Sequence, residues 1–416
     1  MSKSVVVIGG GIVGLCSAYY LQKKGCAVTL IDKSSMNAGA SYVNAGYLTP
    51  SHIIPLAAPG MISTGLRYMF NSASPFYIKP RLDKSFLQWG WAFKKSATAQ
   101  KVTAAIPHIK AINLLSRDLY DAIQSSKELG AFHYERKGLL MLYQSEKEGD
   151  HEKETALRAQ KIGLESELLD PAGIAKVEPN IAIKAYGAVH YLCDGHTTPG
   201  DFMKKMIAYL KDNGVVIKQN ESVEDFELSN GAIKKVRTDQ SEYSADEVVL
   251  ATGSWSALLA KKLGLKLLLQ PGKGYRLDEE KPTGISMPAL LLDAKMAVTP
   301  MKGHTRFAGT MEFSGINTKI RRERVDAIAR GAQQFYTDLQ ISEETKANAQ
   351  CGLRPVSPDG LPYIGRTASV KNAVIATGHA MMGWSLGPAT GLLVSELING
   401  EQTSLDISPY HPDRKF

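Results

Sequence analysis

Three glycines near the N-terminus have the spacing G-x-G-x-x-G. They are Gly9, Gly11 and Gly14, in the run Gly9-Gly10-Gly11-Ile12-Val13-Gly14. In this pattern the first glycine makes a tight turn, the second lets the backbone approach a pyrophosphate, and the third lets a helix pack closely on a strand. Asp32 follows eighteen residues after Gly14, where a carboxylate can accept hydrogen bonds from a ribose diol. These residues predict a dinucleotide-binding site.

The flanking sequence predicts the elements that hold these residues. The β-branched run 4–8 is typical of a buried strand, 15–24 has helical spacing, and 27–31 is a second strand that ends on Asp32. The helix N-terminus offers free N–H groups and a partial positive charge to phosphates. The uncharged run 4–21 could also suggest a signal peptide or membrane anchor. The glycines in mid-run, the missing cleavage site and the following strand argue against both, and we expect a soluble chain.

The composition excludes few function classes. The 416 residues are 44% hydrophobic and 22% charged, and the net charge of +8 suits an anionic substrate as well as an anionic surface. The four cysteines form no C-x-x-C pair, so we expect a reducing, cytoplasmic setting without structural disulfides. Cys193-Asp194-Gly195-His196 looks faintly metal-binding, but no second ligand pair lies at a useful spacing. We interpret it as a turn before a helix that follows Pro199, and expect no metal.

Further segments could contact the same ligand. Small polar residues, Ser41 and Asn44-Ala45-Gly46, end the loop after Asp32 and suit close backbone contact, although an ordinary surface loop remains an alternative. A buried strand at 246–251 ends on Thr252-Gly253. A last buried strand, 374–377, runs into Gly378-His379 and then a helix at 389–398. The nucleotide fold is therefore expected to close with an element far along the chain.

The remaining sequence predicts a second unit. An amphipathic helix is expected from Ile109 to Ile123, ending near Gly130, and a charged helix over 152–162. Strands are expected at 138–143, 186–192, 266–270, 274–277, 294–299 and 305–310, and a hairpin turns at Asn230-Gly231. The arm from Pro50 to Lys95 mixes basic and aromatic residues. We interpret it as a cover of the substrate domain, with nucleic acid or a membrane interface as alternatives.

The ordered motifs resemble the D-amino-acid oxidase superfamily, and most closely its bacterial D-amino-acid dehydrogenases. The resemblance covers nearly the whole chain. Beyond the N-terminal motif it rests on Ala57-Ala58-Pro59-Gly60, Asp194-Gly195, Pro271-Gly272-Lys273-Gly274-Tyr275, Gly352-Leu353-Arg354-Pro355, Pro358-Asp359-Gly360, Gly378-His379 and Gly383-Trp384.

The resemblance implies an α/β fold with a Rossmann-like FAD-binding domain and a mostly antiparallel substrate domain. The expected FAD-binding domain is discontinuous (1–55, 194–265 and 350–400). The expected substrate domain is 56–193 with 266–349, and 401–416 is a tail. The expected FAD-binding residues are Gly9, Gly11, Ile12, Val13, Gly14, Asp32, Lys33, Ser41, Asn44, Ala45, Gly46, Val223, Thr252, Gly253, Gly378, His379, Met381, Met382 and Gly383.

The resemblance also implies which residues bind substrate. In similar enzymes the arginine of the Gly-Leu-Arg-Pro motif binds a substrate carboxylate, which corresponds to Arg354. Some relatives carry a second arginine after the Gly-His pair, where this chain has Met381-Met382. Others tether the flavin through a cysteine, from which Cys351 is offset by one position. Tyr275 and Arg306 are further candidates for the substrate pocket.

The expected reaction is oxidative deamination of D-amino acids, with D-proline or hydroxy-D-proline among the candidates. A hydride passes from Cα to flavin N5, and the electrons then pass to a quinone or another acceptor. Two alternatives remain open at this point: a glycine or sarcosine oxidase that uses O2, and a flavin-binding assembly factor without catalysis. Peripheral contact with the inner face of the membrane through the arm is a further expectation. Nucleic acid is not expected as a partner.

Overall fold

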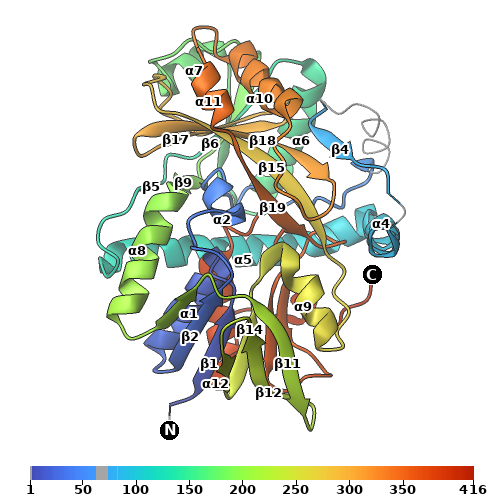
Figure 1. Cartoon of the computed structure of the whole chain (residues 1–416). Coiled ribbons are helices and arrows are strands. Elements are labelled where there is room, and N and C mark those ends of the chain that lie inside the picture. Colours follow the sequence, from blue (N-terminus) through green and yellow to red (C-terminus); the bar gives the residue numbers. More distant parts are fainter. Residues whose placement is uncertain (1, 62–73, 82) are drawn as a thin grey trace.

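The computed structural model describes residues 2–61, 74–81 and 83–416. Two units lie one above the other in Figure 1. The lower unit combines the blue N-terminal strands with the red C-terminal strands and helix, so the two ends of the chain build one sheet. The upper unit holds the larger sheet, and the long helix α5 (Ala99–Ser126) crosses between the two.

The lower sheet has six strands, five of them parallel. Its order is β10 (Val216–Gln219), β2 (Ala27–Asp32), β1 (Ser4–Ile8), β14 (Glu247–Leu250), β21 (Ala373–Thr377) and the antiparallel β20 (Tyr363–Arg366). Apolar β-branched residues fill its central strands because both faces are covered. This arrangement confirms the predicted Rossmann-like unit.

Different elements cover the two faces of the lower sheet. Side chains of α1 (Ile12–Lys23), α5 and α8 (Pro199–Asp212) pack in one apolar cluster with strand residues such as Val7 and Leu30. Helix α12 (Gly387–Asn399) joins this layer, and α1 is its main neighbour. The opposite face packs against α9 (Ser256–Lys262) and the small sheet of β11 (Val223–Ser229), β12 (Ala232–Thr238) and β13 (Glu242–Tyr243). The turn between β11 and β12 is the predicted hairpin at Asn230-Gly231.

The upper sheet has nine strands and is mostly antiparallel, as predicted. Its order is β19 (Gln350–Val356), β15 (Gln270–Glu279), β18 (His304–Phe313), β17 (Met296–Met301), β16 (Ala289–Leu291), β6 (Leu139–Tyr143), β8 (Gly187–Tyr191) and β7 (Ser166–Leu169), and β4 (Phe76–Ile78) pairs with β18. Helices α10 (Arg322–Phe335) and α7 (Pro171–Val177) contribute to one core cluster of this sheet, α6 (Glu146–Lys161) contributes to another, and α11 (Glu343–Ala347) packs against β15.

A small sheet joins the two units. It consists of β3 (Tyr47–Leu48), β9 (Gly195–Thr197) and β5 (Tyr134–Glu135). The short helix α2 (Ala40–Val43) precedes it, and the arm contains α4 (Lys84–Ser96), whose N-terminus is capped by Asp83. Two short 3-10 helices, Gly253–Trp255 and Ser408–Tyr410, complete the described elements.

Two sequence predictions are corrected, those for 266–269 and for position 196. Residues 266–269 are not a strand: Leu267 and Leu269 pack into the core of the lower unit, and β15 begins only at Gln270. Strand β19 pairs with β15 and so lies in the upper sheet, whereas the expected domain division places 350–356 with the nucleotide-binding domain. Position 196 lies in the strand β9 and not in a simple turn.

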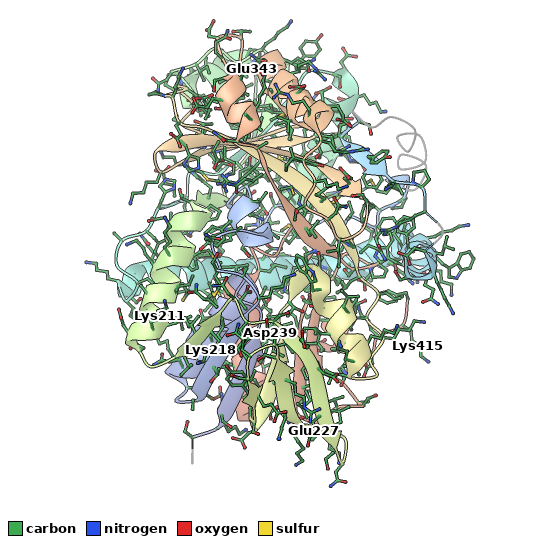
Figure 2. All side chains as sticks on the ribbon, viewed as in Figure 1. Lys211, Lys218, Glu227, Asp239, Glu343 and Lys415 are labelled. Carbon is green, nitrogen blue, oxygen red and sulfur yellow. The ribbon has the colours of Figure 1, made fainter. Side chains whose placement is uncertain are left out.

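The surface carries charges of both signs on both units. Figure 2 labels Lys211, Lys218, Glu227, Asp239 and Lys415 on the lower unit and Glu343 on the upper unit. Among the described residues, no helix is both long enough and apolar enough to cross a bilayer.

Candidate functional site

A cavity of about 1540 Å³ connects the two units. At its lower end it is lined by the glycine loop after β1 and by Asp32 at the end of β2; at its upper end by Thr310 of β18 and Arg354 of β19. Cavities for small ligands usually measure about 300–1,000 Å³. The larger volume is consistent with a cavity that holds a dinucleotide and a substrate end to end.

One side of the glycine loop, residues 9–14, packs against neighbouring backbone, and its other side borders the cavity. A Cβ on Gly9 would lie 2.5 Å from the Ala251 carbonyl oxygen, and one on Gly14 would lie 1.8 Å from the Gly9 oxygen. These two glycines therefore serve close packing within the fold. A Cβ on Gly11 would have only the Ser41 hydroxyl, at 3.2 Å, within 4 Å. Gly11 thus borders open space at the N-terminus of α1, where a pyrophosphate fits.

The carboxylate of Asp32 is held in place by its own loop. Its oxygens accept hydrogen bonds from the backbone N–H of Gly10 (2.6 Å) and of Ser34 (2.8 Å). The Lys33 ammonium lies 3.4 Å from the centroid of the Trp255 ring, and both residues line this end of the cavity. An adenosine ribose at Asp32 would therefore have Trp255 in the same lining, an aromatic residue that the sequence motif does not include.

Most predicted cofactor residues line the cavity. Those that do not are Gly14, Gly46 and Gly378. Gly46 and Gly378 have φ angles of 77° and 82°, and a Cβ on Gly46 would lie 2.2 Å from the Thr197 oxygen. Gly46 and Gly378 therefore allow backbone conformations that other residues would adopt only with strain. The predicted residues in the lining are Gly9, Gly11, Ile12, Val13, Asp32, Lys33, Ser41, Asn44, Ala45, Val223, Thr252, Gly253, His379, Met381, Met382 and Gly383.

The guanidinium of Arg354 lies at the upper end of the cavity, and its side chain is half-buried. It lies so close above Gly274 that a Cβ there would approach Nη2 to 2.2 Å. Its Nη1 donates a hydrogen bond of 2.7 Å to the Thr310 carbonyl. Burial lowers the pKa of Arg354 to about 10, so the group stays charged at neutral pH.

No carboxylate of the described residues lies within 4.0 Å of the Arg354 guanidinium. The stretches 62–73 and 82, which the structure does not describe, contain no aspartate or glutamate. A half-buried cation without an internal counter-ion is suited to an anionic ligand.

Two other residues of the cavity lining were not predicted. Thr310 has a φ angle of 65°, which is strained for a β-branched residue, and its buried hydroxyl has no hydrogen-bond partner among the described residues. The imidazole Nδ1 of His52 lies 3.1 Å from the Ser51 hydroxyl, which donates to the buried Asp194. Burial lowers the pKa of His52 to about 4. No sequence motif marks either residue.

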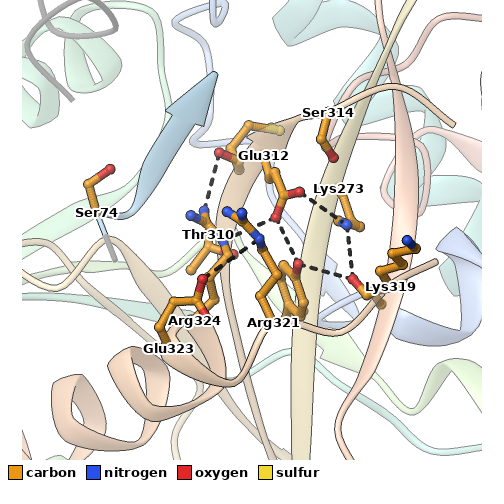
Figure 3. Close-up of polar contacts among 12 residues, drawn as sticks. Ser74, Lys273, Thr310, Glu312, Ser314, Lys319, Arg321, Glu323 and Arg324 are labelled. Carbon is orange, nitrogen blue, oxygen red and sulfur yellow. Dashed lines mark hydrogen bonds and ion pairs between the residues drawn. The ribbon is translucent and has the colours of Figure 1, made fainter. Parts of the chain in front are cut away.

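Tyr275, predicted for the substrate pocket, does not line the cavity. Its hydroxyl donates to Glu312 at 2.8 Å. Figure 3 shows Glu312 among the basic side chains of Lys273, Arg321 and Arg324. The Lys273 ammonium lies 3.1 Å from Glu312, and the Arg324 Nε lies 3.5 Å from it. Because strand residues alternate between faces, Gly274 faces Arg354 while its neighbour Tyr275 faces this charge cluster.

Arg306 also lies outside the cavity lining. Its Nη1 donates to the backbone carbonyls of Tyr42 and Asn44, each at 2.7 Å, and its Nε pairs with Asp278 at 2.8 Å. Arg306 therefore ties α2 and the loop 44–46 that follows it to the upper sheet. This loop contains predicted cofactor residues and is called the cofactor loop below.

Cys351 pairs with Tyr275 across the sheet and so shares its face. Its thiol lies 3.5 Å from the Thr318 carbonyl, and it does not line the cavity. This placement gives no support to a covalent flavin link at Cys351.

Comparison with known proteins agrees with this geometry. The family model described as FAD dependent oxidoreductase (DAO) matches residues 4–397. A D-amino acid dehydrogenase of Helicobacter pylori is 32% identical over 401 residues, which cover 95% of each chain. Glycine oxidase from Geobacillus kaustophilus has the same fold, with a TM-score of 0.79, 22% identity and full coverage of both chains. L-proline dehydrogenase from P. horikoshii superposes with a TM-score of 0.74 and 22% identity, covering 99% of this chain and 97% of its own. The chain therefore belongs to the DAO family of FAD-dependent oxidoreductases.

Proposed function

We propose that this protein is a dehydrogenase of D-amino acids. The observation that carries the proposal is the half-buried Arg354 guanidinium at the end of the cavity opposite the nucleotide motif. A guanidinium matches a carboxylate with two parallel hydrogen bonds, which fixes the orientation of the substrate as well as its charge. The similarity to the H. pylori D-amino acid dehydrogenase supports this assignment.

When bound, FAD supplies the two-electron acceptor for the hydride that leaves Cα. The chain's own residues prepare the substrate for that step. Arg354 holds the carboxylate and so determines which face of Cα is presented. The amine must be neutral before the hydride leaves. His52 lines the same cavity and stays neutral at pH 7, because burial lowers its pKa to about 4, so it adds no positive charge to the cavity. Water then hydrolyses the imine of a primary amino acid to an oxo acid and ammonia; the cyclic imine of D-proline keeps its nitrogen in the product.

The cavity lining favours a substrate with an apolar or small side chain. Many residues from the arm and the upper sheet that line it are apolar, and they include Leu56, Met61, Phe76, Met296 and Met311. A ring such as that of D-proline would be desolvated there without leaving a polar group unpaired. Hydroxy-D-proline would add one hydroxyl, for which the unpaired Thr310 hydroxyl is a partner of suitable chemistry.

The electrons are proposed to leave for a quinone or another carrier near a membrane surface. Helix α4 exposes Leu87 and Trp91, with 58% and 60% of their surface accessible, beside Lys94 and Lys95. Such a combination suits the interface of an anionic bilayer. In this proposal the protein acts in the cytoplasm and binds the inner face of the membrane peripherally.

Anaerobic flavin bleaching tests the proposal. We expect D-amino acids, D-proline among them, to bleach the bound flavin faster than the L-enantiomers, glycine or N-methyl amino acids. Under air, an oxygen electrode should record little O2 uptake, whereas a parallel dye-reduction assay that contains a quinone analogue should record turnover. Bleaching by glycine and sarcosine alone, with one O2 consumed per turnover, would replace the proposal by an amine oxidase. No bleaching by any amine would leave a flavoprotein without this catalysis.

A further inference from the structure

Two histidines and a glutamate converge on the sheet that joins the two units, away from the cavity. They are His133, Glu135 and His196, and their nearest ligand atoms all lie within 4.8 Å of one another. Strand register explains the convergence: Glu135 pairs directly with His196, and directly paired residues point to the same face. His133 precedes Glu135 by two positions and so reaches that face as well.

The spacing of the three groups is close to that of ligands around one metal ion. The Nε2 atom of His133 lies 3.6 Å from one oxygen of Glu135, and the Nε2 atom of His196 lies 3.9 Å from the other. Metal–ligand bonds of about 2.0–2.2 Å in a tetrahedral site place ligand atoms roughly 3.4 Å apart. Shifts of a few tenths of an ångström would therefore bring all three onto one ion.

His196 gives an independent indication of a missing ligand. Its side chain is fully buried, and neither ring nitrogen has a hydrogen-bond partner among the described residues. The Pro300 carbonyl acts on the ring but does not meet the geometry of a hydrogen bond. The nearby His190 differs: its two ring nitrogens lie 2.9 Å from Glu167 and 2.9 Å from the Lys137 carbonyl. Buried polar groups without partners are rare and costly.

His133 is already oriented for metal binding. Its Nδ1 lies 2.8 Å from the Thr198 hydroxyl, which in turn accepts a hydrogen bond from the Lys302 N–H at 2.8 Å. Histidines that bind metals commonly use their second nitrogen for such a bond, which fixes the ring and leaves Nε2 for the ion.

We propose that His133, Glu135 and His196 bind a divalent transition-metal ion. Two imidazoles and one carboxylate suit Zn²⁺, Ni²⁺ or Co²⁺ better than Mg²⁺ or Ca²⁺. The ammonium of Lys137 lies 2.7 Å from Glu135 and competes for it. That lysine side chain is half exposed, so it is free to turn into solvent when an ion replaces it. The proposal does not depend on which substrate the enzyme oxidises.

An ion at this site would join β5 to β9 beside the cofactor loop. The next residue of β9, Thr197, faces the opposite side of the sheet, where its N–H and hydroxyl both donate to the Gly46 carbonyl (2.8 and 3.2 Å). Trp384 donates to the same hydroxyl at 2.7 Å. Metal binding should therefore stabilise the segment that leads out of the cofactor loop, and slow the release of FAD.

The test is isothermal titration of Zn²⁺ into the full-length flavoprotein after treatment with a chelator. We expect one ion per chain, a higher Tm with Zn²⁺ and slower FAD release. His196→Asn and Glu135→Gln should each weaken binding by at least about tenfold, since loss of even an outer partner of a ligand costs that much. Lys137→Met removes the competing ammonium and should tighten binding by a similar factor. His190→Gln, a nearby histidine whose nitrogens have partners, and the exposed His411→Gln should leave the affinity unchanged.

The variants Glu135→Gln and Lys137→Met change partly exposed side chains, so they keep the test valid if His196→Asn fails to fold. Wild type that binds no Zn²⁺ at concentrations of hundreds of micromolar would overturn the proposal. So would binding that survives His196→Asn and Glu135→Gln unchanged, because the ion would then sit on other side chains.

Discussion

Arg354 is a positive charge that two other strands hold in a fixed position at the end of the cavity. Its guanidinium lies over Gly274, where any side chain would displace it, and one of its nitrogens is held by the Thr310 carbonyl. The strained backbone of Thr310 places that carbonyl. The position of the clamp therefore depends on two other strands, and not on the Gly-Leu-Arg-Pro motif alone.

Substitution of Arg354 should impair substrate binding and not cofactor binding. Arg354→Ala is expected to lose on the order of 3–5 kcal/mol of transition-state stabilisation, roughly a hundred- to several-thousandfold in kcat/KM, because the substrate carboxylate is left buried and unpaired. Arg354→Lys keeps the charge without the planar fork, and its kcat/KM should lie between those of wild type and Arg354→Ala. Steady-state kinetics with D-amino acids and the absorbance of bound flavin give the two readouts. If kcat/KM of the Arg354→Ala variant stayed within about tenfold of that of wild type, Arg354 would not be the carboxylate clamp.

Protonation of His379 should lower the stability of the fold at acid pH. Burial lowers its pKa to about 3, and its Nε2 lies 2.9 Å from the Thr390 hydroxyl. A histidine with a lowered folded pKa contributes stability above its unfolded pKa of about 6.5, and loses it as pH falls toward 3. At pH 5 this loss is roughly 2 kcal/mol relative to pH 7. Urea unfolding at both pH values should show that His379→Gln reduces the difference, while the exposed His411→Gln does not; an equal difference in all three would contradict the assignment.

At the scale of elements, the strand–loop–helix unit separates two kinds of glycine. A Cβ on Gly9 or Gly14 would meet backbone atoms, whereas among the described residues a Cβ on Gly11 would meet only the Ser41 hydroxyl. Substitutions at the first two should therefore damage the fold, and a substitution at the third should damage ligand binding.

Gly11→Val should yield a folded protein without FAD. The branched side chain would occupy the space where the pyrophosphate approaches the N-terminus of α1. Circular dichroism should match that of wild type stripped of its flavin, and the flavin absorbance should be lost. Gly14→Val is the contrasting variant, because its side chain would collide with the Gly9 carbonyl and prevent α1 from packing. Stoichiometric flavin in Gly11→Val would mean that the cofactor lies elsewhere.

Helix α4 should mediate contact with anionic membranes. Its exposed Trp91 lies near the ammonium groups of Lys94 and Lys95, at 5.5 and 5.8 Å from the ring centroid. Neutralising both lysines should weaken binding to phosphatidylglycerol vesicles by about 2 kcal/mol, roughly thirtyfold, at low salt. Neutralising Lys211 and Lys218, two exposed lysines of the lower unit (Figure 2), is the matched control. Wild type that does not sediment with vesicles at low salt would leave α4 as a cover of the upper sheet.

At the scale of the whole molecule, Arg306 connects the two units. Its side chain reaches from β18 to the backbone that runs from α2 into the cofactor loop, and Asp278 holds it there. The loop 44–46, of which Asn44 and Ala45 line the cavity, is thus positioned by the upper unit.

Loss of this connection should loosen the cofactor more than the substrate. Arg306→Met removes two charge-assisted hydrogen bonds to the carbonyls of Tyr42 and Asn44, each worth about 1.5–3 kcal/mol, and also the two hydrogen bonds to Asp278. We expect the Kd of FAD to rise at least about tenfold, with KM for the amino acid little changed once FAD is saturating. Fluorescence titration of apoprotein with FAD measures the first, and kinetics at saturating FAD measure the second. A large KM effect with unchanged FAD affinity would return Arg306 to the role of a substrate residue.

The sequence by itself determined the nucleotide-binding unit, because its signals are local. The spaced glycines, the strand before them and Asp32 all lie within one short segment. In that segment the spacing of apolar residues distinguishes strand from helix. The family resemblance added FAD and the Arg354 motif, since these also rest on short ordered segments.

Only the tertiary structure decided which residues of the upper sheet face the cavity. Adjacent residues of a strand point to opposite faces, so the composition of the Gly274-Tyr275 pair could not show that the glycine accommodates Arg354 while the tyrosine turns to Glu312. The three groups proposed to bind metal meet for a related reason. His133 and Glu135 lie about sixty residues before His196, and only the pairing of β5 with β9 brings them to one face. Strand register is a property of the folded sheet, and no local pattern in the chain encodes it.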